Sequence, residues 1–237
     1  MVGRYLAWRA RTARPPLRLS EKAARYGAAA VLVAALIFAW PVASGYLEGK
    51  RAAPAYAERA DALLAAGRGP ADLGPGRWDK LLAVQDPGFA AHRGVDLSTP
   101  GAGITTVTQS LAKRLGFDEF RPGWAKLRQT GLALGYEARM TKDQIAALWL
   151  ETVEMGRLPA DGPWTIGFWP AAERAHGSAP AALDEAQFRD LVARLVAPAV
   201  LGDDAAARAD RAARIGRLWA GACAPRDHGD VWLEGCR

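Results

Sequence analysis

A short segment in the first half of the chain gathers the side chains best suited to acid/base chemistry. Asp86 and His92 are residue types that serve as general bases, and Phe89 and Gly94 lie in the same segment. Gln85, directly before the aspartate, has nearly the shape of a glutamate but cannot accept a proton at neutral pH. The segment therefore predicts a polar site whose amide can bind a hydroxyl group but cannot act as a base.

A second segment carries polar side chains at helical spacing. Thr106, Gln109, Ser110 and Lys113 are spaced i, i+3, i+4 and i+7, which places them on one face of a helix. Gly116 is a residue type that commonly ends a helix. We therefore expect a helix that presents a hydroxyl group and a cation on the same side.

Together with a third segment, from Lys126 through Gln129 to Glu137, these segments resemble the motifs of glycosyltransferase family 51, the bacterial peptidoglycan glycosyltransferases. That family reads Glu-Asp-x-x-Phe-x-x-His-x-Gly, then Gly-Gly-Ser-Thr-x-Thr-Gln-Gln-Leu-x-Lys-Asn, then Arg-Lys-x-x-Glu-x-x-x-Ala-x-x-x-Glu. With weaker matches further on, the resemblance covers roughly residues 78–200. It implies an all-α, lysozyme-like domain.

The resemblance also implies a reaction, in which a sugar 4-hydroxyl attacks an anomeric carbon and undecaprenyl pyrophosphate leaves. This reaction needs a base for the hydroxyl proton and cations for the charge that develops on the pyrophosphate. The family's proposed base corresponds to Gln85, and its second essential Glu corresponds to Gln129. Asp86 keeps the second acidic position of the first motif and is the third catalytic candidate. Because loss of a positioned base typically costs about 10²–10⁴-fold in rate, we expect impaired or absent transfer.

Several positions are candidates for substrate binding by the same resemblance. Lys113 matches the family lysine near the pyrophosphate, although a lysine on a helix is otherwise most often a solvated surface group. His92 matches a residue of the family's cleft wall, and Phe89 is a residue type common in protein cores. Ser110 and Arg114 stand where the family has Gln and Asn. The substrate-binding candidates are Phe89, His92, Thr106, Ser110, Lys113 and Lys126.

The net charge of +6 is concentrated at the N-terminus. Residues 1–25 carry seven basic side chains and one acidic side chain, and seven minus one leaves the rest of the chain neutral. A neutral body has no basic surface for a polyanion, so the composition argues against a nucleic-acid partner.

Residues 26–47 form an uncharged, apolar run long enough to span the hydrocarbon core of a bilayer, about 30 Å thick. Pro41 is expected to kink or end this helix. The basic residues before it predict a cytoplasmic N-terminus and a periplasmic body, held at the inner membrane. The alternative is a cleaved signal peptide, for which residues 42–44 offer a tolerable cleavage site.

The remainder divides into a connector over residues 48–77, the domain over 78–200, and a C-terminal helix and tail over 201–237. No alternating run is long enough to predict a strand. No second domain of transpeptidase size is visible, so the chain resembles the monofunctional members of the family. Cys223 and Cys236 could form a disulfide or remain two unpaired thiols. The spacing predicts no metal ligands, and only the resemblance suggests a divalent cation as cofactor.

Two groups of side chains admit more than one interpretation. Trp164, Phe168 and Trp169 could form an apolar rim facing lipid or pack in the core. Glu151 and Glu154 are interpreted as surface groups.

Three functions are consistent with these patterns. The first is a degenerate relative that binds lipid II or nascent glycan, or regulates cell-wall synthesis proteins. The second is a working transferase that uses Asp86 or His92 in place of the lost acids. The third is a membrane scaffold that has lost its ligand.

Overall fold

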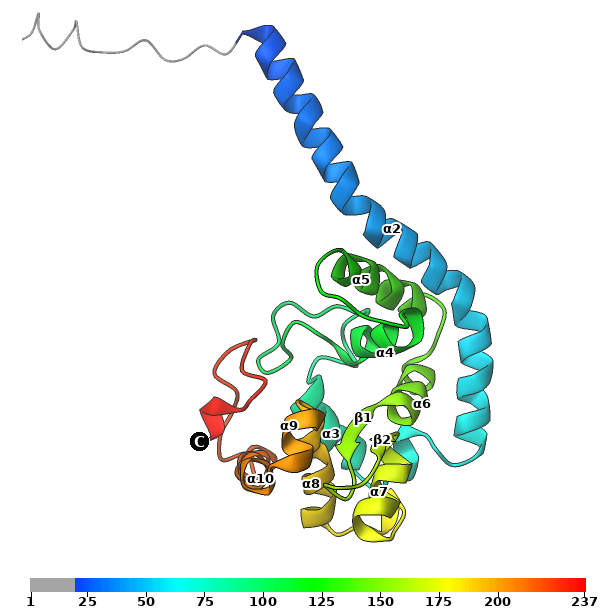
Figure 1. The fold of residues 1–237 in the computed structure, drawn as a ribbon, viewed down its shortest axis with the longest axis vertical. Coiled ribbons are helices and arrows are strands. Elements are labelled where there is room, and N and C mark those ends of the chain that lie inside the picture. The colour runs from blue at the N-terminus through cyan, green and yellow to red at the C-terminus, as the bar shows by residue number, and fades with distance from the viewer. Residues whose placement is uncertain (1–19) are drawn as a thin grey trace, which may run out of the picture. The chain divides into compact units, whose positions relative to one another are not determined.

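The structure is a computed structural model that describes residues 20–237, and its elements are almost all helical (Figure 1). Most of the basic segment predicted over residues 1–25 lies outside this range. The longer helices are α2 (Glu21–Ala65), α3 (Arg77–Gln85), α4 (Val107–Gly116), α5 (Trp124–Glu137), α6 (Lys142–Thr152), α7 (Phe168–His176), α8 (Glu185–Arg194), α9 (Pro198–Asp203) and α10 (Ala205–Trp219). Three short 3-10 helices are η1 (Pro70–Leu73), η2 (Pro180–Ala182) and η3 (Glu234–Cys236).

A two-stranded antiparallel sheet is the exception to the helical pattern. Strand β1 (Glu154–Arg157) pairs with β2 (Trp164–Ile166), and the register is interrupted between Glu154 and Gly156. Strands this short show too few alternations for sequence periodicity to detect, which explains why none was predicted. The predicted all-α class is confirmed, with this hairpin as its one β element in the described residues.

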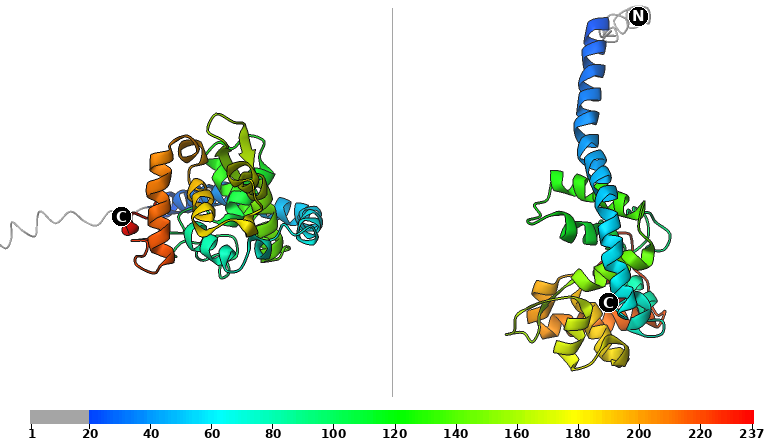
Figure 2. Two further views of the ribbon diagram at one scale, coloured as in Figure 1. Left: turned by 90° about the horizontal axis from the view of Figure 1, so that it is seen from below. Right: turned by 90° about the vertical axis from the view of Figure 1, so that its right-hand side faces the viewer.

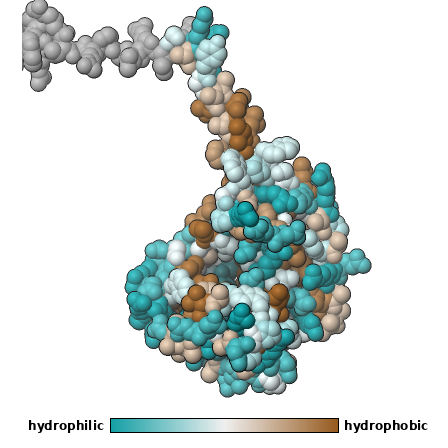
Figure 3. Space-filling model, viewed as in Figure 1, coloured by the Kyte–Doolittle hydropathy of each residue, from teal (hydrophilic) through white to brown (hydrophobic). Residues whose placement is uncertain are grey.

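The described chain forms two compact units, one ending at Trp40 and one spanning Pro41–Arg237. The first unit is the beginning of α2, where large apolar side chains such as Val31, Leu36 and Phe38 are more than half exposed. Apolar residues cover this part of the helix after its first polar turn (Figure 3). By length and composition, α2 is able to cross a membrane, and a signal sequence would have the same properties.

Helix α2 continues through Pro41 and Pro54, so it does not end at Pro41, which was one of the two outcomes expected there. Its second half belongs to the helical unit, and this half and α10 lie on opposite sides of that unit (Figure 1 and Figure 2).

Glycines bring the second half of α2 close to α5. A Cβ atom at Gly45 or Gly131 would overlap a backbone carbonyl oxygen of the other helix, and one at Gly49 would lie 2.6 Å from the carbonyl oxygen of Leu132. A Cβ atom at Gly135 would lie 2.5 Å from the carbonyl oxygen of Tyr46. Both helices thus carry glycines four residues apart, a pattern that lets two helix backbones approach closely.

The core of the helical unit draws on more of the chain than the predicted domain. Ala53, Ala60 and Leu73, from the predicted connector, are fully buried in the same cluster as Ile215 and Cys236, from the predicted tail. The boundary at residue 77 follows from Gly/Pro breaks and the boundary at residue 200 from the extent of the family resemblance, and neither signal carries information about burial. The largest fully buried side chains of this core include Leu81, Leu111, Leu132, Tyr136, Ile145, Leu148, Leu150, Met155, Phe168, Phe188 and Leu191.

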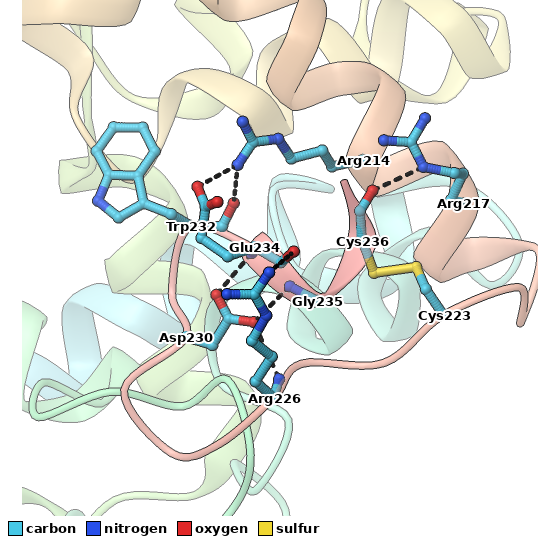
Figure 4. Close-up of a disulfide and its surroundings, with 9 residues drawn as sticks. All are labelled: Arg214, Arg217, Cys223, Arg226, Asp230, Trp232, Glu234, Gly235 and Cys236. Atoms are coloured by element: carbon cyan, nitrogen blue, oxygen red, sulfur yellow. Dashed lines mark hydrogen bonds and ion pairs between the residues drawn. A yellow bond between two sulfur atoms is a disulfide. The ribbon is translucent and has the colours of Figure 1, made fainter.

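Cys223 and Cys236 form a disulfide, which decides between the two alternatives left by the sequence (Figure 4). The loop that it closes is organised by Asp230, whose carboxylate accepts hydrogen bonds from the backbone N–H groups of Arg226, Glu234 and Gly235. Burial alone would raise the pKa of Asp230, but these backbone hydrogen bonds lower it. The C-terminal residues are therefore an ordered part of the domain.

Candidate functional site

A cavity of about 340 Å³ opens in the helical unit. The face of this unit seen in the space-filling view has a recess at its centre (Figure 3). The cavity lies between the loop before α4, the end of α3, the start of β1 and the turn between α8 and α9. Its volume is at the lower end of the range for small-molecule sites in proteins. The polar side chains of the predicted site that line it are Gln85, Thr106, Ser110 and Lys113, joined by Arg114 and Glu154.

Asp86 and His92 form a buried pair outside this cavity. Nε2 of His92 lies 3.0 Å from both carboxylate oxygens of Asp86, and Oδ2 of Asp86 also accepts from the backbone N–H of Val107 at 2.8 Å. Nδ1 of His92 accepts from the backbone N–H of Gly94, so Nε2 carries the proton that is donated to Asp86. These hydrogen bonds connect the segment of Asp86 and His92 to the start of α4, and neither residue lines the cavity.

Thr106 and Phe89 also have structural contacts. Thr106 is the N-cap of α4, accepts from the backbone N–H of Gln109, and donates to the carbonyl oxygen of Gly94 at 2.8 Å. It therefore precedes the helix instead of sharing its exposed face, although part of it borders the cavity. Phe89 is 2% exposed and meets Trp78 edge-on. The structure places Phe89 in the core, where a substrate cannot contact it.

The two Gln positions do not share the cavity. Gln85 ends α3 and borders the cavity, whereas Gln129 is 1% exposed and lies between α5 and α4. The Gln129 amide donates to the carbonyl oxygen of Gln109, and its own side-chain oxygen is buried without a partner. Gln129 therefore cannot contact a ligand in this cavity. The sequence pattern could not show this, because it does not tell which side of α5 faces α4.

Ser110 and Arg114 are held together at the wall of the cavity. Nη1 of Arg114 donates to Oγ of Ser110 at 2.7 Å, and Nε donates to Oγ1 of Thr152 at 3.1 Å. Ser110 also lies 3.3 Å from the indole N–H of Trp149. Burial lowers the pKa of Arg114 to about 10, while the charge of Glu154 acts in the opposite direction. Arg114 was noted in the sequence only as a departure from the family pattern.

Two lysines contribute positive charge beside the cavity. Lys113 lines it, and Lys126 donates to the hydroxyl group of Thr105 at 2.8 Å, next to the same wall. Burial, and secondly the charge of Lys113, lower the pKa of Lys126. The two ammonium groups therefore repel each other in the absence of an anion, and neither forms an ion pair with a side chain of residues 20–237.

Glu154 was interpreted from the sequence as a surface group, and its role in lining the cavity was not predicted. It is the first residue of β1, is exposed, and is the one carboxylate bordering the cavity in the described chain. The sequence offered no signal, because the residue lies in a hairpin too short to predict. The aromatic cluster is also split by the structure: Phe168 is fully buried, Trp169 is half-buried, and Trp164 is 41% exposed.

The residues present do not fit a divalent cation. Such ions bind several oxygen ligands, with carboxylates prominent among them. Gln129 has a neutral amide in place of a carboxylate, and its N–H group donates to a carbonyl oxygen. Within residues 20–237, no group of three or more His, Cys, Asp or Glu side chains lies close enough to hold a metal ion.

The C-terminal loop forms part of the cavity wall. The backbone N–H groups of Gly101 and Gly103 donate to the carbonyl oxygens of Asp227 and His228, at 2.9 and 2.8 Å, and Val231 borders the cavity. This contact joins residues more than a hundred positions apart in the chain. The disulfide-closed loop therefore supports the segment that leads into α4.

Comparison with known proteins identifies a family. A family model described as Transglycosylase matches residues 99–218. Penicillin-binding protein 1B of Escherichia coli is 33% identical over 92 residues, which are 33% of this chain and 11% of that protein. Two proteins of Neisseria meningitidis called biosynthetic peptidoglycan transglycosylase are 31% identical over 139 residues, 52% of this chain; these cover 56% of the protein from serogroup C and 79% of the other. The chain thus matches only about a tenth of the length of the E. coli protein.

Proposed function

Because this chain belongs to the transglycosylase family, whose domain is all-α and lysozyme-like, we propose that it binds lipid II or nascent glycan in the cavity beside α4. We further propose that it transfers sugar slowly at best. The observation that carries the proposal is the meeting of Gln85, Ser110 and Lys113 at one cavity, with Lys126 beside it.

The electrostatics of the cavity support an anionic ligand. Lys113 and Lys126 lack an anionic partner in the described chain, and the lowered pKa of Lys126 reflects burial and the neighbouring charge of Lys113. A pyrophosphate placed between them would relieve this repulsion and gain charge-assisted hydrogen bonds. Gln85 and Ser110 supply hydrogen-bonding groups suited to sugar hydroxyls.

Weak transfer is proposed because of the groups that the site lacks. Gln85 occupies the position of the family's base and cannot accept a proton. Asp86 and His92, the alternative bases, are bonded to each other and lie outside the cavity. A site without its positioned base is typically slower by about 10²–10⁴-fold.

We also propose that the apolar part of α2 anchors the protein in the inner membrane, with the helical unit in the periplasm. Exposed apolar side chains along α2 and the basic segment before it favour this orientation. The disulfide between Cys223 and Cys236 is typical of an oxidising compartment. An alkaline phosphatase fusion at the C-terminus should be active in cells, and an inactive but intact fusion would contradict this orientation.

The ligand proposal is tested with fluorescent lipid II and the full chain in detergent. We expect saturable binding, which Lys113→Ala weakens at least tenfold. Lys80→Ala is the matched control, because it removes the same charge from a surface pair with Glu185 that does not line the cavity. Absence of binding by the native chain would leave the scaffold function as the better explanation.

A further inference from the structure

Glu154 is placed to accept a proton at the cavity, which the amide of Gln85 cannot do. Its carboxylate is exposed at the edge of the cavity that Gln85 also borders. Within the described part of the chain, no ion pair within 4.0 Å and no side-chain hydrogen bond engages it, so its lone pairs are available to a ligand. A carboxylate accepts protons readily, whereas an amide does not.

The other charged groups that line the cavity, and the buried pair of Asp86 and His92, are excluded as bases by their contacts or their chemistry. Asp86 is 0% exposed, and its carboxylate accepts hydrogen bonds from His92 and from the backbone N–H of Val107. The one basic nitrogen of His92 accepts from Gly94. Lys113 and Arg114, the remaining charged groups of the cavity, are cations that stabilise negative charge instead of removing protons.

The charges around Glu154 are arranged for a transfer reaction. Arg114 is close enough for the two charges to influence each other, and Lys113 lies on the same cavity wall. A ligand in this cavity would thus meet a carboxylate for a hydroxyl proton and cations for a departing phosphate. These are the two needs of sugar transfer from a pyrophosphate.

We infer that Glu154 is the catalytic base of this cavity, in place of Gln85, and supports slow transfer. This inference rests on the proposed function. In the step, the acceptor hydroxyl oxygen forms a bond to the anomeric carbon while the bond from that carbon to the phosphate oxygen breaks. The pyrophosphate leaves with the electron pair, and Glu154 takes the hydroxyl proton, which it later releases to water.

The experiment measures glycan formation from labelled lipid II by the full chain, together with lipid II affinity. We expect slow polymerisation by the native protein and a loss of about 10²–10⁴-fold in Glu154→Gln, with unchanged affinity. Glu151→Gln is the matched control: this carboxylate lies three residues away, pairs with Arg68 and does not line the cavity. We expect the control to polymerise at the native rate. Thermal unfolding of both variants verifies that they fold.

The possible outcomes separate this inference from the proposed function. Equal rates in Glu154→Gln and the native chain would overturn the inference, as would a native chain that binds lipid II but never polymerises it. In both cases binding would still support the proposed function. A native chain that neither binds nor polymerises lipid II would overturn both. If Gln85→Glu restores polymerisation to Glu154→Gln, the two positions share one role, as the inference requires.

Discussion

The side-chain amide nitrogen of Gln129 donates a hydrogen bond to the backbone carbonyl oxygen of Gln109 across 2.6 Å. Gln129 is 1% exposed, so water cannot replace this contact. Only a hydrogen-bond donor can face a carbonyl oxygen at such a distance, and an ionised carboxylate has none. Gln129 therefore belongs to the contact between α4 and α5, and an ionised Glu at this position would not fit the present structure.

We predict that Gln129→Glu destabilises the domain. At neutral pH the new carboxylate would face the Gln109 carbonyl oxygen, which should cost at least about 1–3 kcal/mol of the free energy of unfolding. Burial should raise the pKa of this carboxyl group above its unfolded value. The hydrogen bond that only the protonated form can donate to the Gln109 carbonyl oxygen should raise it further. The loss of stability should therefore be small at low pH and grow as pH rises through the folded-state pKa. Denaturant unfolding at several pH values measures this.

Gln187→Glu is the control for that substitution. Gln187 lies in an exposed capping box at the start of α8, where its side-chain oxygen accepts from the backbone N–H of Asp184. A glutamate serves equally well at this position, so stability should be unchanged. A stable Gln129→Glu variant at neutral pH would show that the contact between α4 and α5 can rearrange.

The glycine contact between α2 and α5 should not tolerate a methyl group. In Gly131→Ala the new Cβ would overlap the carbonyl oxygen of Val42, and overpacking of this kind costs about 1–3 kcal/mol. Gly27→Ala, in the same α2 helix, has no atom within 4 Å of its Cβ. Since alanine is favoured over glycine in helices by about 1 kcal/mol, this control should not destabilise the protein. Thermal unfolding in detergent compares the two, and equal melting temperatures would contradict the prediction.

Removal of the disulfide should loosen the cavity wall. In the double variant Cys223→Ser/Cys236→Ser, we expect a loss of about 2–4 kcal/mol, because the closed loop no longer restrains the unfolded chain. Hydrogen exchange should then quicken at the amides of Gly101 and Gly103, which donate to the C-terminal loop. Unchanged protection at these two amides would show that the loop stays docked without its covalent link.

The pKa of Lys126 should respond to the removal of Lys113. Burial is the larger cause that lowers this pKa, and the charge of Lys113 adds to it. In Lys113→Ala the pKa of Lys126 should therefore rise partway toward its ordinary value of 10.5, as NMR titration of the lysine side chains would detect. Lys80→Ala should leave it unchanged. Because only the protonated form attracts phosphate, lipid II binding should weaken as pH rises through the pKa of Lys126.

Much of the helical architecture could be predicted from local patterns. The polar spacing predicted the helix α4, and Gly116 ends it as expected, although Thr106 caps the helix instead of lying on its face. These features depend on neighbours within one turn of helix, so the sequence contains the information directly. The apolar run of α2 and the motifs that identify the family are local in the same sense.

The composition of the site was less predictable. Lys113, Ser110 and Gln85 do meet at one cavity, but Asp86, His92 and Phe89 do not line it, and Asp86 and Phe89 are buried. The motif placed all six near one another without showing which would face the ligand. Glu154 and Val231 entered the cavity wall from a short hairpin and a C-terminal loop that carry no recognisable motif.

The sequence by itself determined most of the helices, the apolar N-terminal segment and the presence of amides at positions 85 and 129, because each follows from residue type and short-range spacing. Only the tertiary structure decided that Gln129 lies against Gln109 while Gln85 borders the cavity, and that Glu154 is the carboxylate left facing it. The reason is that orientation and burial depend on packing between segments distant in the chain, which local patterns do not record.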